Sequence, residues 1–297
     1  MVFGGSGSID LTAKICRKLN ICQGRCKIIR FSEGNIFVQI DEDICGIDVY
    51  VVQSIAIPVS DNLLELLFLL DACKRANAKS VTAVIPYFSY GKGDKMDNMQ
   101  GSIRARVCAD AIVASGADRV IFVDLHTQQI QGFFNIPVSN LHALPLFCNA
   151  LKGKSFVDPV IVAPDIGFIK QARSYAKALE CPVVMIHKER IEHDEKPVVV
   201  DLFGDVKGKT AIIVDDFIAT GGTLLAAAHR LSELGTSSIW AAITHGLFTM
   251  NASEKIKDSP IEGLTITDTV ENSTILTGNK IYVLSVAPLI CRAILGN

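Results

Sequence analysis

The sequence predicts an α/β protein of two similar domains, each with a mainly parallel sheet flanked by helices. Short apolar runs alternate with helix-length segments along the whole chain, as they do where crossover helices join parallel strands. Several runs are continuously apolar, which is typical of strands covered on both faces. With 297 residues and 49% hydrophobic content, the chain is long enough to bury two cores.

The predicted strands and helices follow one another in a regular order. The strands are IFVQI (36–40), DVYVVQS (48–54), VTAVIPYF (81–88), RVIFVDLH (119–126), VIVAPD (160–165), VVMIHK (183–188), TAIIVDD (210–216), IWAAITHG (239–246) and KIYVLSV (280–286). Helices are predicted between them over 62–77, 103–115, 167–179 and 222–234.

A hint of internal duplication divides the chain. The segments ASGADRVIFVDLH (114–126) and SELGTSSIWAAITHG (232–246) both run from a helix end through a glycine turn to a strand with a histidine near its end. We therefore expect one domain over 1–141, with 284–297 packing back on it, and a second over 142–283. The join falls near NLHALPLF (140–147), where no low-complexity linker stands.

Charge and composition exclude several classes of protein. A formal net charge of -2 gives no electrostatic reason to expect nucleic-acid or membrane-surface binding. The chain has no apolar run of membrane-spanning length, and MVFGGSGSID lacks the regions of a signal peptide. The nine cysteines are scattered and odd in number, so we expect free thiols and a cytoplasmic location.

The stretch AIIVDDFIATGGTLLAAA (211–228) has the densest group of candidate site residues. Asp215 and Asp216 follow an apolar run and could accept hydrogen bonds from vicinal sugar hydroxyls, because an ionised carboxylate offers two acceptor oxygens. The loop that leads into the next helix consists of Ala219, Thr220, Gly221, Gly222 and Thr223. Backbone amides at a helix N-terminus favour a phosphate there. The alternative is a tight turn with a threonine N-cap.

The sequence IIVDDFIATGGTL resembles the phosphoribosyl-diphosphate-binding loop of type I phosphoribosyltransferase folds. Segments such as RFSEGNIFVQIDEDICGIDVYVVQS, GADRVIFVDLHTQQIQGFFNIPV and GDVKGKTAIIVDD extend a resemblance to ribose-phosphate diphosphokinases nearly end to end. The resemblance implies phosphoribosyltransferase-like domains, the second of them with the ribose-phosphate loop. It also implies transfer of a diphosphoryl group from Mg-ATP to the C1 hydroxyl of ribose 5-phosphate, which gives phosphoribosyl diphosphate and AMP.

The resemblance also assigns the magnesium contacts. Asp124 and His126 stand two apart, so in an extended strand their side chains would face the same way. By resemblance His126 is a magnesium or diphosphate contact and a catalytic residue, with Asp124 as a supporting group. Asp165 follows a buried run and resembles the second metal ligand of the family. Magnesium prefers oxygen ligands and retains water, so one carboxylate plus substrate oxygens is sufficient. A core histidine and a helix-capping aspartate are the alternative interpretations.

Lys188 and Arg190 form a Lys-x-Arg pair in IHKERIEHDEKP. The resemblance places this pair on a loop that closes over the transferring phosphates, as catalytic residues. Fixed cations stabilise a phosphoryl-type transition state because its charge is spread over several oxygens. A solvated charged turn is the alternative interpretation.

The expected nucleotide site departs from the family pattern in two segments. Phe-Ser-Asp-Gly-Glu is replaced by a segment in which Phe31 can stack on a purine, Glu33 replaces the aspartate and Asn35 lacks the final carboxylate. Tyr-Ala-Arg-Gln-Asp-Arg is replaced by Tyr-Gly-Lys-Gly-Asp-Lys (90–95). The nucleotide-binding candidates here are Lys92, Asp94 and Lys95. Lysine in place of arginine forfeits a bidentate guanidinium, so we expect base recognition to change.

Further departures bear on regulation and assembly. Two arginines that bind phosphate or ADP in regulated relatives are replaced by Cys45 and Gln100, so we expect activity without inorganic phosphate. The family builds its ATP site partly from a neighbouring subunit, which implies a homodimer or hexamer. Two other functions stay open: diphosphoryl transfer to ADP-ribose or another 5-substituted ribose, because Ala219 replaces an acid found in many relatives, and a non-catalytic regulatory subunit.

Overall fold

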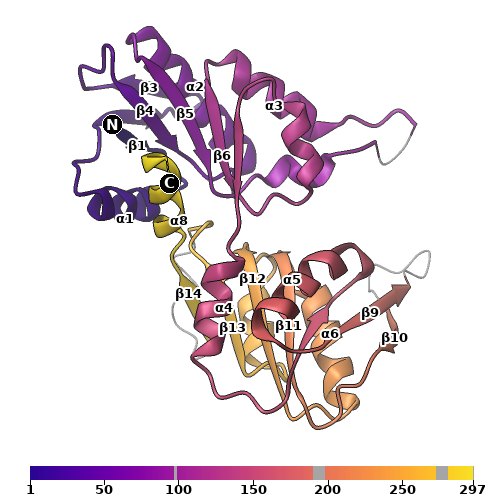
Figure 1. Ribbon diagram of the computed structural model, residues 1–297. Helices are drawn as coiled ribbons and strands as arrows, with labels where there is room; N and C mark the ends of the chain where they lie inside the picture. Colours follow the sequence, from indigo (N-terminus) through magenta and orange to yellow (C-terminus); the bar gives the residue numbers. More distant parts are fainter. Residues whose placement is uncertain (97–98, 190–197, 272–279, 297) are drawn as a thin grey trace. The chain divides into compact units, whose positions relative to one another are not determined.

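The computed structural model describes residues 1–96, 99–189, 198–271 and 280–296 of the chain (Figure 1). Over 187–189 and 198–201 this description covers the backbone. The chain divides into two compact units, each described by itself below. The first unit comprises Met1–His142, Thr269–Glu271 and Ser285–Asn297, and the second comprises Ala143–Asp268 and Asn272–Leu284. None of the described helices has the length and apolar character needed to cross a membrane.

The first unit is built on a five-stranded sheet with the order β1-β4-β5-β6-β7, in which every neighbouring pair is parallel. Strands β2 and β3 form a separate antiparallel hairpin. In chain order its elements are β1 (Val2–Gly4), α1 (Ile9–Leu19), β2 (Cys26–Arg30), β3 (Ile36–Ile40), β4 (Asp48–Val52), α2 (Val59–Arg75), β5 (Ser80–Ile85), the 3₁₀ helix η1 (Ser89–Gly93), α3 (Arg104–Ala114), β6 (Arg119–Val123), the 3₁₀ helix η2 (Gln128–Phe133), β7 (Val138–Leu141) and α8 (Ala287–Leu295).

The second unit is built on a seven-stranded sheet with the order β10-β9-β8-β11-β12-β13-β14. Only the β10–β9 pair at one edge is antiparallel among its described strands. In chain order its elements are α4 (Leu144–Lys152), β8 (Pro159–Ala163), the 3₁₀ helix η3 (Ile166–Phe168), α5 (Ile169–Leu179), β9 (Val183–Glu189), β10 (Val198–Phe203), β11 (Thr210–Ile218), α6 (Gly222–Glu233), β12 (Ser238–Gly246), α7 (Ala252–Lys257), β13 (Gly263–Thr267) and β14 (Ile281–Leu284).

Each unit has its own apolar core. In the first, side chains of the central strands such as Val51 and Phe122 pack with the inner face of α2, including Leu66 and Leu70. In the second, Ile213 of β11 belongs to a cluster with side chains of α6 and the neighbouring strands. Burying such continuous apolar strands between helices contributes about 25 cal/mol per Å² of apolar area, so these layers provide most of the driving force for each fold. The polar residues that follow the strands are thereby held at the edges of rigid sheets.

The predicted fold class is confirmed, because both main sheets are largely parallel and are flanked by helices (Figure 1). Every predicted strand run overlaps an observed strand, and every predicted helix overlaps an observed helix. The prediction missed β1, β2, β7, β10 and β13, together with α1, α4, α7 and α8. Several missed strands are short or polar, such as VFG and VSNL. Such segments become strands because a neighbouring strand satisfies their backbone, which no local pattern records.

Candidate active site

The paired acids of the second unit lie inside a strand rather than after it. The predicted strand run TAIIVDD ends with the acids, but β11 continues to Ile218, and Asp215 is in register with Ile243 of β12. This correction has a simple cause: β12 continues to Gly246 and supplies backbone partners for Phe217 and Ile218. The acids therefore stand on rigid sheet backbone near the carboxyl end of the strand, where ligands bind in open α/β sheets.

Asp215 and Asp216 are held by the backbone beside them. The amide of Asp216 donates a 2.9 Å hydrogen bond to Asp215 Oδ1, and the amide of Phe217 donates a 2.9 Å bond to Asp216 Oδ1. Burial raises the pKa of Asp215 well above its ordinary value, and the neighbouring charges of Asp216 and Asp165 raise it further. A site of this kind favours hydroxyl donors or a cation that offsets the crowded negative charge.

The loop after β11 ends at an open helix N-terminus. Gly221 is the N-cap residue of α6 and adopts a left-handed backbone with φ 79°, which explains the glycine. The threonine N-cap interpretation is wrong about the position, because the N-cap residue is Gly221; the Gly222 amide donates a long hydrogen bond of 3.5 Å to Thr220 Oγ1. The first amides of an α-helix have no acceptor within the helix, so this terminus can bind an anion. Gly222 is exposed at that end and Thr223 is partly so.

Asp165 begins the 3₁₀ helix that follows β8. Its Oδ1 accepts a 3.1 Å hydrogen bond from the amide of Phe168, so the residue does cap this short helix. Capping occupies one carboxylate oxygen and does not exclude the second from a metal. Asp165 also lies near enough to Asp215 to raise the pKa of that carboxyl group. The structure therefore brings Asp165 together with the paired acids of β11.

The predicted Lys-x-Arg pair is described in part. Lys188 belongs to β9, where its backbone is in register with Val199 of β10. Arg190 lies outside the described residues. The role of both side chains stays a prediction.

In the first unit, the chain leaves β6 earlier than predicted. The prediction that Asp124 and His126 share one face of an extended strand is wrong, because β6 ends at Val123 and Asp124 adopts a left-handed backbone with φ 41°. The Asp124 carboxylate lies 3.1 Å from Nδ1 of His142, and this hydrogen bond raises the pKa of His142 against the opposing effect of burial. His126 is exposed just beyond this turn.

The loop with His126 contacts one of the predicted nucleotide segments. Thr127 Oγ1 donates a 2.8 Å hydrogen bond to Asp94 Oδ2. Gly91 of η1 also lies close to His126, since a Cβ atom at Gly91 would stand 3.8 Å from the Cβ of that histidine. Lys92 follows in η1, and Lys95 is exposed just after it. The structure thus brings the YGKGDK segment together with the predicted metal-binding loop.

The other predicted nucleotide segment is the tip of the β2–β3 hairpin. The Phe31 amide donates a 2.9 Å hydrogen bond to the Asn35 carbonyl, which closes the turn. Phe31 is 44% exposed, so its ring is accessible to a ligand. Glu33 and Asn35 are exposed at the same tip, where Asn35 Oδ1 accepts a 2.8 Å bond from the Ile36 amide. This bond occupies the amide oxygen of Asn35 in the turn itself.

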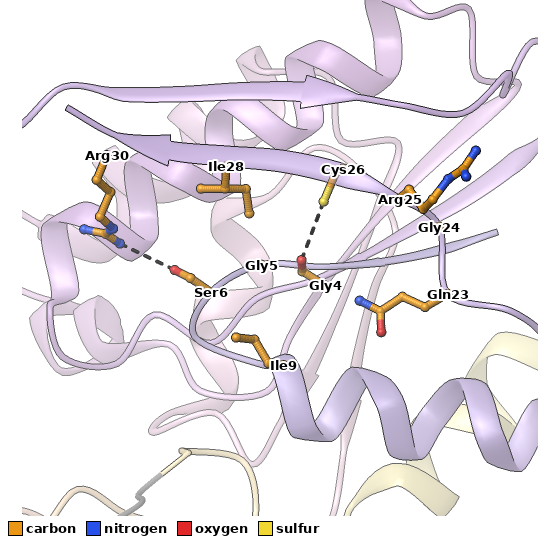
Figure 2. A pocket seen from close by; sticks show the side chains of 10 residues that line it. All are labelled: Gly4, Gly5, Ser6, Ile9, Gln23, Gly24, Arg25, Cys26, Ile28 and Arg30. Atoms are coloured by element: carbon orange, nitrogen blue, oxygen red, sulfur yellow. Dashed lines mark hydrogen bonds between the residues drawn. The ribbon is translucent and has the colours of Figure 1, made fainter.

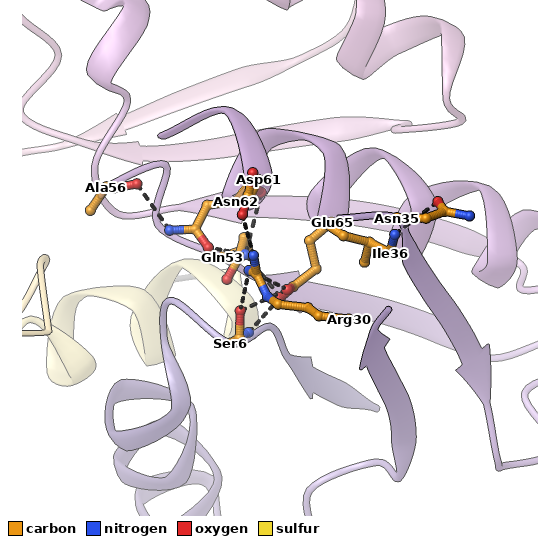
Figure 3. Close-up of polar contacts among 9 residues, drawn as sticks. All are labelled: Ser6, Arg30, Asn35, Ile36, Gln53, Ala56, Asp61, Asn62 and Glu65. Atoms are coloured by element: carbon orange, nitrogen blue, oxygen red, sulfur yellow. Dashed lines mark hydrogen bonds and ion pairs between the residues drawn. The ribbon is translucent and has the colours of Figure 1, made fainter. Parts of the chain in front are cut away.

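A polar cluster beside the tip end of this hairpin was missed by the sequence analysis. Its centre is Glu65 of α2, whose buried carboxylate contacts Arg30, Ser6 and Gln53 (Figure 3). The signal that could have found it is a single charged residue inside the apolar run LLELLFLL of α2. Such an acid at a core-facing helix position requires partners from elsewhere in the fold.

Taken separately, the two units provide complementary binding chemistry. In the second unit, carboxylates that can accept hydrogen bonds from hydroxyl groups stand beside a helix N-terminus that can bind an anion, and this combination suits a sugar phosphate. The first unit combines an exposed aromatic ring with lysines at 92 and 95, which suits a nucleotide. Among the described residues no group of three or more His, Cys, Asp or Glu side chains is arranged to hold a metal ion. A divalent cation would therefore need substrate oxygens to complete its coordination.

Comparison with known proteins covers almost the whole chain. Residues 1–116 match the N-terminal domain of ribose phosphate pyrophosphokinase, and residues 190–296 match the phosphoribosyl synthetase-associated domain. The ribose-phosphate pyrophosphokinase of Aquifex aeolicus is 44% identical over 99% of this chain and 94% of that protein. The corresponding protein of Campylobacter jejuni is 41% identical over 99% of this chain and 94% of that protein.

A solved structure gives the same result. The crystal structure of phosphoribosylpyrophosphate synthetase from Mycobacterium smegmatis is similar to this chain with a TM-score of 0.94 and 35% identity, and the match covers 100% of this chain and 97% of the other. The sheet topology, the loop after β11 and the similarity over the full length all point to the same family. The chain belongs to the ribose-phosphate pyrophosphokinase family.

Proposed function

We propose that this protein transfers the diphosphoryl group of Mg-ATP to the C1 hydroxyl of ribose 5-phosphate, giving phosphoribosyl diphosphate and AMP. The observation that carries the proposal is the sequence Asp215-Asp216 on rigid β11 backbone, followed by the uncapped N-terminus of α6, in a chain 44% identical to a pyrophosphokinase. An acid pair followed by free helix amides fits a ribose with a phosphate attached.

The acceptor would be bound by residues of the second unit. The carboxylates of Asp215 and Asp216 accept hydrogen bonds from the ribose hydroxyls, and the loop from Ala219 to Thr223 binds the 5-phosphate. Burial around Asp215 excludes water and strengthens these hydrogen bonds. Positioning the acceptor in this way lowers the entropic part of the barrier to transfer.

The donor would be bound by residues of the first unit. Phe31 stacks on the base, while Glu33 and Asn35 contact its edge. Lys92 and Lys95 bind the phosphates, and Asp94 holds the loop through Thr127. Lys188 and Arg190 stabilise the diphosphoryl group in transit, because fixed cations act on charge that develops over several oxygens.

The described residues fit a magnesium ion. Asp165 and the neighbouring acids present carboxylate oxygens, which Mg²⁺ prefers, and a cation there would offset the negative charge that raises the pKa of Asp215. In the second unit Asp165 would hold the ion, and in the first unit His126 is a candidate contact for a metal ion or its bound phosphates. When bound, the ion would supply positive charge that offsets the negative charge of the phosphates.

The assembly and location follow from the same family membership. We propose at least a homodimer, or a hexamer, with each ATP site completed by a neighbouring subunit, in the cytoplasm. We also propose that each unit is one phosphoribosyltransferase-like domain, with the sugar-phosphate loop in the second. Light scattering during gel filtration measures the oligomeric state, and a monomer that retains full activity would contradict the shared site.

The decisive experiment measures AMP formed from Mg-ATP in phosphate-free buffer, with ribose 5-phosphate and ADP-ribose as separate acceptors. We expect AMP with ribose 5-phosphate, and a loss of about 100-fold or more in Lys188→Ala because a fixed cation is removed. Asp205→Asn is the matched control, since Asp205 is an exposed acid of the same unit paired only with Lys209 among its described ion pairs.

Two outcomes would contradict the proposal in different ways. AMP formed with ADP-ribose alone would keep the chemistry and change the acceptor. No AMP with either acceptor, together with stimulation of an active relative on mixing, would indicate a regulatory subunit.

A further inference from the structure

The buried carboxylate of Glu65 has no part in the site described so far. Its side chain is 0% exposed, and it belongs to α2, where it contacts Arg30 at the tip end of β2 (Figure 3). A buried carboxylate is costly unless hydrogen bonds replace its water. The contacts made by Glu65 therefore show what it holds in place.

Four donors converge on Glu65. Its Oε1 accepts a 2.5 Å bond from the Ser6 amide and a 3.0 Å bond from Gln53 Nε2. Its Oε2 accepts a 2.6 Å bond from Ser6 Oγ and a 3.4 Å bond from Arg30 Nη2. An ionised carboxylate has only acceptor capacity, and here both of its oxygens are used.

The carboxylate also occupies the position that an anion would take at the glycine-rich loop between β1 and α1. The amides of this loop are already satisfied, because Ser6 donates to Glu65 and Gly7 donates a 2.9 Å bond to Gln53 Oε1. The loop is therefore not a phosphate site. Its amides and the Ser6 hydroxyl bind the carboxylate of Glu65 and the side chain of Gln53 instead, and we call these contacts of Ser6, Gly7, Gln53 and Glu65 the anchor.

Arg30 connects this anchor to the predicted nucleotide site. It is the last residue of β2, is in register with Ile36, and directly precedes Phe31 at the tip. Its guanidinium bridges two acids of α2, pairing with Asp61 through Nη1 and with Glu65 through Nη2. A planar guanidinium held at two points fixes direction as well as distance.

Apolar side chains hold most of the hairpin against the first unit. Cys26 and Ile28 of β2, together with apolar residues of β3, pack against its core. A cavity of about 590 Å³ lies between β2 and the loop after β1, and Cys26, Ile28 and Arg30 belong to its lining (Figure 2). Alternate residues of a strand face the same side, and Arg30 is the one of these three nearest the tip. Its ion pairs with the two acids of α2 therefore support the end of β2 that leads into the tip.

We propose that Glu65 is a positioning residue for the nucleotide: through Arg30 it fixes the direction in which the hairpin tip presents Phe31 to the base. The turn from Phe31 to Asn35 is closed by its own hydrogen bonds, so it moves as one body with the end of β2. This inference rests on the proposed function, since it takes the tip to contact the base of ATP. It assigns to α2 a part in choosing the nucleotide.

The test uses three variants of the full chain. Glu65→Gln keeps the size of the side chain and removes its charge. Asp61→Asn weakens the other ion pair of Arg30 at a half-exposed side chain and leaves the buried carboxylate of Glu65 intact. Asp71→Asn, which alters an exposed pair with Arg75 on the same helix, is the matched control. Each variant is measured for KM and kcat with ATP and GTP, for KM of ribose 5-phosphate, for affinity for a non-hydrolysable ATP analogue by calorimetry, and for melting temperature.

We expect Glu65→Gln and Asp61→Asn to raise the KM for ATP and weaken analogue binding by roughly fivefold or more, because a misplaced contact loses its binding energy. In both variants the preference for ATP over GTP should also fall, while the KM for ribose 5-phosphate should stay unchanged. All measured values should stay unchanged in Asp71→Asn. An unchanged KM for ATP in Asp61→Asn, or a Glu65→Gln variant that loses only melting temperature, would overturn the proposal. Failure of the proposed function can be told apart from failure of this proposal. If the unaltered protein forms no AMP, the proposed function fails, but the affinity of each variant for the ATP analogue still tests the role of Glu65.

Discussion

At the scale of single residues, Gly93 illustrates how a departure from the family pattern is accommodated. A Cβ atom at this position would stand 2.5 Å from Nε and 2.9 Å from Cβ of Arg104, the first residue of α3. The Cβ of Arg104 is fixed to the helix backbone and cannot swing away. Glycine at 93 and arginine at 104 are therefore mutually dependent, a relation that local sequence patterns do not show.

We predict that Gly93→Ala destabilises the protein by about 1–3 kcal/mol, as overpacking does. Adding Arg104→Ala should recover part of this loss by removing the guanidinium. Gly132→Ala is the control, because nothing lies within 4 Å of its added Cβ. Urea denaturation measures each free energy of unfolding, and strictly additive effects of the two substitutions would contradict the proposed clash.

His142 supports a prediction about pH. Its pKa is raised above the ordinary value of 6.5 mainly by the hydrogen bond to Asp124. A raised histidine pKa means that the folded state binds the proton more tightly, so the stabilisation is complete below the ordinary pKa and disappears as pH rises through the raised value. NMR titration of His142 in the unaltered protein and in Asp124→Asn measures this. The midpoint should fall in the variant, and an equal midpoint in both would contradict the assignment.

At the scale of secondary-structure elements, α1 is capped by a residue from far along the chain. Its N-cap residue Ser8 makes no side-chain cap, and Glu271 Oε1 instead accepts hydrogen bonds from the amides of Asp10 (2.5 Å) and Leu11 (3.2 Å). A carboxylate at a helix N-terminus also interacts favourably with the helix dipole. Sequence patterns describe caps between neighbours, so this one could not be predicted.

We expect Glu271→Ala to lower the free energy of unfolding by about 0.5–2 kcal/mol, the usual loss when a helix cap is removed. Hydrogen exchange gives the sharper measurement, because the amides of Asp10 and Leu11 should exchange faster while amides of α6 do not change. Glu262→Ala serves as a control at an exposed acid. Unchanged exchange at both α1 amides would contradict the capping role.

The scale of elements also shows what could be predicted in the site. The loop at 219–223 was predicted because glycine and hydroxyl residues at a strand-to-helix junction have few other uses. The ends of β6 and β11 were not predicted, since their lengths are set by the partners β7 and β12. The capping bond of Asp165 likewise depends on a turn geometry that only the folded chain displays.

At the scale of the whole molecule, the first unit is assembled from distant parts of the chain. Helix α8 packs on α1, where Cys291 lies 3.7 Å from the Ile15 carbonyl and the Tyr50 hydroxyl donates to the carbonyl of Ile294 at 3.3 Å. The segment Thr269–Glu271 belongs to the same unit and accepts a bond from Ser54 through the Thr269 carbonyl. Residues 1–142 are therefore an incomplete unit.

We predict that a fragment of residues 1–142 does not unfold cooperatively, because Leu11 and Ile15 of α1 lose the apolar cover of α8. The same fragment continued through a flexible linker into 285–297 should recover a cooperative transition. Circular dichroism against urea measures both. A fragment of 1–142 that unfolds as sharply as the joined chain would show that α8 adds nothing to this unit.

The sequence by itself determined the α/β class, the order of the main strands and helices, and the glycine-containing loop that joins β11 to α6, because each follows from local periodicity or from residue types within a few positions. Tertiary structure alone decided that Glu65 is buried against Ser6 and Arg30, that Glu271 caps α1, and that Asp124 turns toward His142. The physical reason is that a buried charge or an open helix end is satisfied by whichever group the fold brings to it. That group is chosen by packing over long sequence distances, for which a linear pattern has no signal.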